Sequence, residues 1–276
     1  KNLNPLRFIA ASPVIIHHTE KYRWFRGLPH YIFDPVIFLF GKLGVDIFFV
    51  LSGFLITSLL VIEKDRYKKI DIRKFYIRRI LRIWPLYFLI ALLALFVWPH
   101  VPALRVPQMA DPYKHLVPNV LLIFLFLPNL QMLLYKAITY EAQAWSIGVE
   151  EQFYLVWPFI MNFTKNRRHV KKAVIVLLGL YLLINLSFFL IPLLTHHFNK
   201  LNDLNFYLAD IFQIDCMMIG GLFALFNFVE RSKKIITNKF VQVAAYILVV
   251  VFTARGLTFG FFYWEIYALL FGVIIL

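Results

Sequence analysis

The feature that most constrains this chain is a succession of apolar segments separated by short polar connections. The segments lie at residues 4–18, 36–62, 80–98, 115–135, 145–163, 170–194, 205–229, 239–253 and 259–276. A spanning helix needs about 20 mainly apolar residues, and most of these segments have that length. The chain is 61% hydrophobic, whereas a soluble domain is roughly 45–50% apolar. We therefore predict an all-α polytopic transmembrane bundle, of about eight or nine spanning helices, in a single domain over residues 1–276.

The two ends of the chain bear on how complete this bundle is. The sequence stops inside an apolar run at 266–276, so we expect a truncated C-terminus. The first apolar segment is short and follows a basic start, a combination that superficially resembles a signal peptide. Because His17 and His18 close its apolar run, we expect a retained first helix.

Basic residues indicate how the bundle is oriented. The net charge is +14, and Lys and Arg gather in the connections at 63–79, 165–172 and 231–239. Short basic loops stay in the cytoplasm, so we predict a multi-pass protein of the inner (cytoplasmic) membrane. Because these charges alternate with apolar segments, they do not indicate nucleic-acid binding.

The segment at 115–135 conflicts with that orientation if it crosses the membrane. Three crossings between Arg79 and Lys165 would put the second basic connection outside. Pro118 and Pro128 interrupt this segment, and non-helical backbone at membrane depth must line a cavity or lie inside the protein. We therefore predict that 115–135 is re-entrant or interfacial.

Ionisable side chains within apolar segments are the candidates for chemistry, since each costs roughly 2.5–3.5 kcal/mol at the bilayer centre. Arg7 and His18 flank ten residues of the first helix, which places them towards opposite ends of it. His18 has the chemistry of a general base, although a histidine at a helix end can also simply form a hydrogen bond there. Pro13 lies between them and is expected to remove one backbone hydrogen bond.

Three further groups lie in the following segments. Asp46 is a carboxyl group within an apolar run, suited either to pairing with an arginine or to acting as a base. Arg79 and Arg82 are three residues apart and share a helix face, where they could bind phosphate or anchor the chain at the cytoplasmic side. Glu150 begins an apolar helix, where a carboxylate also favours the helix N-terminus.

The sequence lacks the signatures of several well-known kinds of site. Cys216 is the only cysteine, which excludes an intrachain disulfide, and it is expected to be a small core residue. There is no glycine-rich phosphate loop, zinc-spaced Cys and His cluster or Gly-x-Ser-x-Gly turn. We expect no metal.

Four stretches together resemble the acyltransferase family 3 membrane proteins. In order they are LRFIAASPVIIHH, GVDIFFVLSGFLIT, FYIRRILRIWPLYF and WSIGVEEQFYLVWP, within residues 4–160. The resemblance implies transfer of an acetyl or similar acyl group from cytoplasmic acyl-CoA to a hydroxyl of an extracytoplasmic carbohydrate, a modification of the cell envelope. It places the family's signature residues on Arg7, His18, Asp46, Ser52, Gly53, Arg79, Arg82, Trp145, Ser146 and Glu150.

On this resemblance we assign expected roles. Arg7, Arg79 and Arg82 bind acyl-CoA; His18 acts as the base, and Glu150 or Asp46 orients it or an arginine. His17, Trp145 and Ser146 contact the acceptor. A transient acyl-histidine remains an alternative to direct transfer. A transporter or flippase of a sugar or lipid-linked substrate is the alternative function, and a non-catalytic receptor or scaffold is a third.

Overall fold

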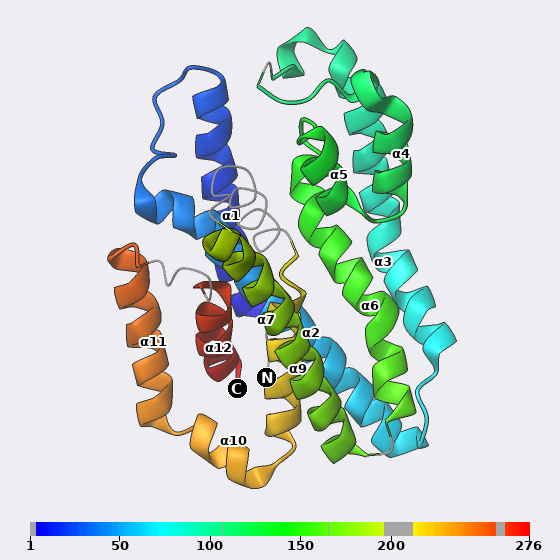
Figure 1. Cartoon of the computed structure of the whole chain (residues 1–276), viewed down its shortest axis with the longest axis vertical. Helices are drawn as coiled ribbons and strands as arrows, with labels where there is room; N and C mark the ends of the chain where they lie inside the picture. The colour runs from blue at the N-terminus through cyan, green and yellow to red at the C-terminus, as the bar shows by residue number, and fades with distance from the viewer. Residues whose placement is uncertain (1–3, 107, 165, 196–211, 258–262) are drawn as a thin grey trace.

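The computed structural model describes residues 4–106, 108–164, 166–195, 212–257 and 263–276 (Figure 1). Its α-helices are α1 (Asn4–Phe25), α2 (Pro35–Tyr67), α3 (Ile72–Leu92), α4 (Leu116–Phe124), α5 (Pro128–Tyr135), α6 (Trp145–Phe163), α7 (Arg167–Thr195), α9 (Ile214–Asn227), α10 (Glu230–Ile236), α11 (Lys239–Ala254) and α12 (Tyr263–Ile275). Single turns are η1 (Leu93–Val97), η2 (Trp98–His100), η3 (Pro102–Leu104), η4 (Pro112–His115) and η5 (Ala142–Ala144). The all-α prediction is confirmed for the described residues, where an isolated bridge joins Ala110 to Ile138.

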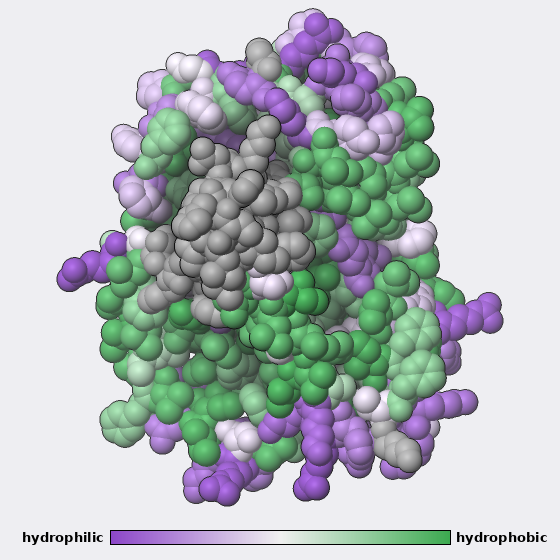
Figure 2. All heavy atoms as spheres, viewed as in Figure 1, coloured by the Kyte–Doolittle hydropathy of each residue, from purple (hydrophilic) through white to green (hydrophobic). Residues whose placement is uncertain are grey.

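Apolar side chains on the surface fit the expected lipid environment. Phe8, Leu81 and Phe240 expose 73%, 71% and 86% of their surface. Figure 2 shows hydrophobic residues across the middle of the molecule and hydrophilic residues at both ends. Within the described residues, Pro35–Tyr67 and Ile72–His100 are long and apolar enough to cross a membrane, and the bent α10–α11 pair would add a third span. The larger number expected from the sequence stays a prediction.

The basic connection at 63–79 is shorter than the sequence suggested. α2 continues to Tyr67 and α3 begins at Ile72, so only residues 68–71 link the two helices. Apolar periodicity stops before Glu63, but charged residues continue both helices because they are good helix formers. Lys68 ends α2 in a left-handed conformation with φ 60°.

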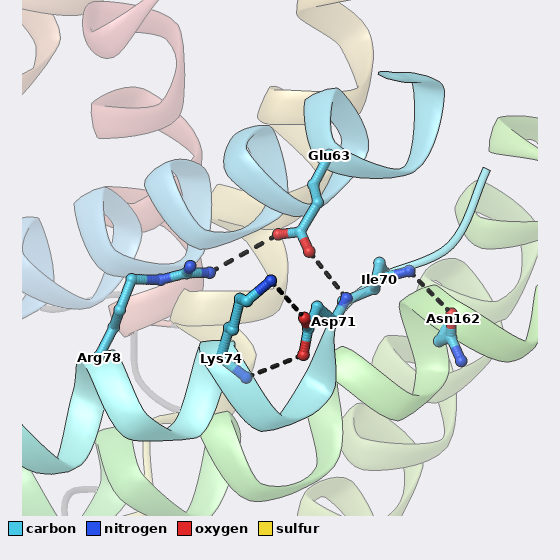
Figure 3. A network of polar contacts seen from close by, with 6 residues as sticks. All are labelled: Glu63, Ile70, Asp71, Lys74, Arg78 and Asn162. Carbon is cyan, nitrogen blue, oxygen red and sulfur yellow. Dashed lines mark hydrogen bonds and ion pairs between the residues drawn. The ribbon is translucent and has the colours of Figure 1, made fainter. Parts of the chain in front are cut away.

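Side-chain contacts fix this tight α2–α3 turn (Figure 3). The Asp71 carboxylate accepts the Lys74 backbone N–H at 3.0 Å and caps α3; this bond lowers the pKa of Asp71. The Glu63 carboxylate accepts the Asp71 backbone N–H at 2.8 Å and pairs with Arg78 at 3.7 Å. The turn is also bound to α6, because the Asn162 side chain accepts the Ile70 N–H.

The first and fourth predicted segments also differ from a simple spanning helix. α1 continues through Pro13 and ends at Phe25, seven residues beyond His18. The 115–135 segment forms two helices, α4 and α5, that contact each other. Between them Phe126 has φ 59°, and Pro128 begins the second helix. As the prolines indicated, this segment is not one continuous helix.

The arrangement of the helices separates the molecule into two ends. In Figure 1 the α2–α3 turn, the start of α7 and α10 lie at the lower end, and these hold the three basic stretches. α4 and α5 both lie in the upper half, beside α3 and α6. The chain therefore rises through α3 and descends through α6, with α4 and α5 between them at the upper end. That 115–135 is re-entrant or interfacial stays a prediction.

α2 and α9 form the closest helix pair of the core. A side chain at Gly53 would collide with the Met217 carbonyl, and one at Gly220 would collide with the Val50 carbonyl. The two glycines thus let the backbones touch, as small residues do between membrane helices. α1, α6 and α12 pack around α2. α2 therefore holds in place the two groups of polar residues that are described below.

Candidate active site

The adjacent residues His17 and His18 have different surroundings. His17 Nδ1 lies 3.3 Å from the Ile37 carbonyl oxygen, and its ring occupies the space that a side chain at Gly41 would need. His17 therefore packs α1 against α2. His18 instead lines a pocket of about 530 Å³. Its ring forms no hydrogen bond with any of the described residues.

Polar groups from α1 and η5 surround this pocket, here called the His18 pocket. Its lining includes Tyr22, Arg23, Arg26 and Gln143, together with apolar residues of α1. The Tyr22 hydroxyl accepts a hydrogen bond from the Gln143 side chain at 3.4 Å. Tyr22 follows His18 by four residues, which places the two side chains on the same face of α1. The pocket therefore offers an imidazole beside an amide and a hydroxyl.

A second polar group lies between α2, α3 and α6. The Glu150 carboxylate accepts hydrogen bonds from Ser52 Oγ at 2.6 Å and from the Tyr154 hydroxyl at 3.2 Å. Arg79 and Arg82 attract it electrostatically. Arg79 lies over the Tyr154 ring at 5.2 Å, whereas Arg82 is exposed. The structure thus brings together the predicted arginine pair and the predicted glutamate.

Sequence reasoning passed over Tyr154, which belongs to this group. Tyr154 lies four residues after Glu150, and that spacing on a helix is the signal that could have identified it. The neighbouring Glu151 accepts a hydrogen bond from the Trp84 indole at 3.1 Å. Because Trp84 belongs to α3, this bond holds α3 against α6 next to Arg79 and Arg82.

Asp46 lies apart from both groups. Its side chain is completely buried, where α2 meets α9 and α12. Its electrostatic neighbours there are Cys216, Asp215 and Glu265. Among the described residues no arginine bonds to Asp46, so the pairing expected from the sequence is not seen.

The remaining predicted residues occupy separate positions. Trp145 packs edge-on against Phe49 at 5.8 Å. Ser146 Oγ donates to the Gln143 carbonyl at 3.3 Å and so adjoins the His18 pocket. Arg7 forms no hydrogen bond or ion pair with the described residues. It belongs to the first turn of α1, and its role in binding the donor stays a prediction.

The predicted residues therefore form two groups rather than one. His18 and Ser146 border the His18 pocket, while Arg79, Arg82 and Glu150 meet between α3 and α6. Among the described residues, no hydrogen bond joins His18 to Glu150 or to Asp46, and the arginine pair is not part of the His18 pocket lining. Within the residues that the structure describes, no cluster of three or more His, Cys, Asp or Glu side chains is arranged to hold a metal ion.

This arrangement can be compared with known proteins. The Staphylococcus aureus O-acetyltransferase OatA is 31% identical over 242 residues, covering 87% of this chain and 36% of that protein. The peptidoglycan O-acetyltransferase OatA of Listeria monocytogenes is 29% identical over 193 residues, covering 66% of this chain and 27% of that protein. A Bacillus subtilis protein named as a putative peptidoglycan O-acetyltransferase, YrhL, is 31% identical over 168 residues, covering 58% of this chain and 23% of that protein.

The chain thus spans about a third or less of the length of these curated relatives. No solved structure matches it. The family model described as an acyltransferase domain, that of the acyltransferase 3 family, matches residues 1–276. This match covers every segment that forms the two groups of polar residues, and the chain belongs to the acyltransferase 3 family.

Proposed function

We propose that this chain moves an acetyl or similar short acyl group across the inner membrane, from cytoplasmic acyl-CoA to a hydroxyl group of a cell-wall carbohydrate. The observation that carries the proposal is the His18 pocket, which presents an imidazole ring with no hydrogen bond from the described residues. The pocket lies at the end of α1 that is remote from the basic connections. The names of two of the relatives contain the words peptidoglycan O-acetyltransferase, which supports a cell-wall glycan as the acceptor.

In this proposal the donor binds from the basic end. Arg79 and Arg82 contact the phosphates of acyl-CoA, because guanidinium groups bind phosphate oxygens in pairs. Glu150 fixes the arginine pair by its charge and is held in turn by Ser52 and Tyr154. The surrounding basic residues raise the local concentration of an anionic donor.

The acceptor binds in the His18 pocket. The neutral His18 imidazole takes the proton of the sugar hydroxyl while the hydroxyl oxygen attacks the thioester carbonyl carbon. The new ester C–O bond forms, the C–S bond breaks, and the leaving thiolate takes the proton back from the imidazolium. Ser146 and Gln143 lie beside this step and are the polar groups available to orient the hydroxyl.

The proposal is tested by replacing His18. Vesicles that hold the protein receive labelled acetyl-CoA on the side of the basic connections and glycan acceptor on the other. We expect His18→Ala to lower the transfer of label at least about a hundredfold, since general-base catalysis contributes roughly 10²–10⁴-fold. His169→Ala is the matched control, because His169 is exposed and bonds only to Asn166 of its own turn.

Two outcomes would contradict the proposal. Normal transfer by a correctly inserted His18→Ala protein would exclude His18 as the base. Movement of a sugar across the vesicle membrane without consumption of acetyl-CoA would identify a transporter instead.

A further inference from the structure

A second pocket lies beside the His18 pocket, at the outer end of α3. It has a volume of about 460 Å³, and its lining includes Trp98, His100, Asp111 and Tyr113. We call it the Trp98 pocket. His100 Nε2 lies 2.9 Å from the Tyr113 hydroxyl, so part of its polar lining is already ordered. Both pockets have the size of small-ligand sites, which are roughly 300–1,000 Å³.

A row of three aromatic rings connects the two pockets. Tyr22, from the His18 pocket, stacks on Tyr140 with ring centroids 5.1 Å apart. Trp98, from the Trp98 pocket, meets Tyr140 edge-on with ring centroids 5.0 Å apart. Aromatic rings combine an apolar face with a polar edge, and such surfaces suit the C–H faces and hydroxyl groups of sugars.

The wall of the Trp98 pocket is attached directly to the helix that carries His18. The Arg26 guanidinium, just beyond α1, donates to the Ala103 carbonyl of η3. The Gln108 side chain donates to the Phe25 carbonyl at the last residue of α1. These bonds set the distance between the two pockets, because they hold residues 98–106 and 108–113 against the end of α1. A ligand that spans both pockets therefore meets a preformed surface.

We propose that the Trp98 pocket is a second sugar-binding site, and that the two pockets bind successive sugars of one glycan chain. The inference rests on the proposed function, because the His18 pocket must hold the sugar that is acylated. The Trp98 pocket then holds a neighbouring sugar of the same chain, and the row of Tyr22, Tyr140 and Trp98 lies beneath the linkage.

The test compares acceptors of different length in vesicles that hold the whole protein, with labelled acetyl-CoA as donor. The acceptors are N-acetylglucosamine and its tetramer, and the quantity measured is the ratio of their kcat/KM values. We expect the parent protein to favour the tetramer at least about tenfold, which corresponds to 1.4 kcal/mol of additional binding. Trp98→Ala should reduce this ratio to near one.

Two more variants guard against a simple loss of folding. Thr139→Trp places a large ring in the Trp98 pocket, which Thr139 lines, and it should reduce the ratio in the same way. Trp24→Ala is the control. It removes an exposed ring that lies at the same end of the molecule but lines neither pocket, so the ratio of kcat/KM values should stay that of the parent protein.

The outcomes separate this inference from the proposed function. Equal kcat/KM for both acceptors in the parent protein, or equal losses on both in Trp98→Ala and Thr139→Trp, would overturn the inference and leave the proposed function standing. Transfer of label to a polypeptide in place of either glycan would overturn both.

Discussion

At the scale of single residues, the direction in which a side chain points separates His17 from His18. Adjacent residues of a helix point about 100° apart, so one imidazole faces α2 while the other faces the His18 pocket. Glu150 and Glu151 separate in the same way, one bonding to Ser52 and Tyr154 and the other to Trp84. In each of these two pairs of identical neighbours, the two side chains therefore have different surroundings.

The exposed Arg82 gives a prediction at this scale. Arg82→Ala should raise the KM for acetyl-CoA about tenfold or more, since a hydrogen bond to a charged group contributes roughly 1.5–3 kcal/mol. Lys69→Ala is the control, because Lys69 is also exposed and basic but lies in the α2–α3 turn, away from Glu150. Equal KM values for the two variants in a steady-state assay would remove Arg82 from the donor site.

At the scale of helices, close backbone contact between α2 and α9 organises the core. α2 carries Asp46 and Ser52 and also packs against α1, which carries His18. A displacement of α9 from α2 would therefore shift both polar groups of the site. The Lys64 ammonium adds to this rigidity, because it donates to the Met161, Asn162 and Thr164 carbonyls at the end of α6.

Gly53 provides a stability prediction for this contact. Gly53→Ala should lower the melting temperature by about 5 °C, since overpacking costs roughly 1–3 kcal/mol and each kcal/mol shifts Tm by about 2–4 °C in a chain of this size. Gly179→Ala in α7 should not lower Tm, because a Cβ there has no neighbour within 4 Å and alanine favours a helix. Thermal unfolding of the two detergent-purified variants measures these melting temperatures. Coincident unfolding curves for Gly53→Ala and Gly179→Ala would contradict the prediction.

At the scale of the whole molecule, the separation of charge predicts which segments share a side of the membrane. The three basic stretches gather at one end, and the two pockets lie at the other. A donor that is anionic and a carbohydrate acceptor would therefore approach from opposite ends. This separation is the physical basis of the transfer across the membrane that we propose.

Labelling of introduced cysteines tests this orientation. Lys69→Cys and Lys234→Cys, both exposed at the basic end, should react with an impermeant maleimide only after cells are permeabilised. Lys114→Cys in η4, at the opposite end, should react in intact cells. The parent chain is the blank, because its single cysteine, Cys216, is buried. Labelling of all three positions from the same side would refute the proposed topology.

The sequence by itself determined the all-helical class, the family and the break at 115–135, because length, apolarity and proline act locally along the chain. It also singled out His18, Arg79, Arg82 and Glu150 as candidates, because ionisable side chains stand out within apolar segments. Their surroundings were decided by tertiary structure alone. Asp46 joined Asp215 and Glu265 instead of an arginine, and His17 packed on Gly41. The position of the row of Tyr22, Tyr140 and Trp98 likewise depends on how distant helices cross, because a local pattern specifies the face of a helix but not the partner that it meets.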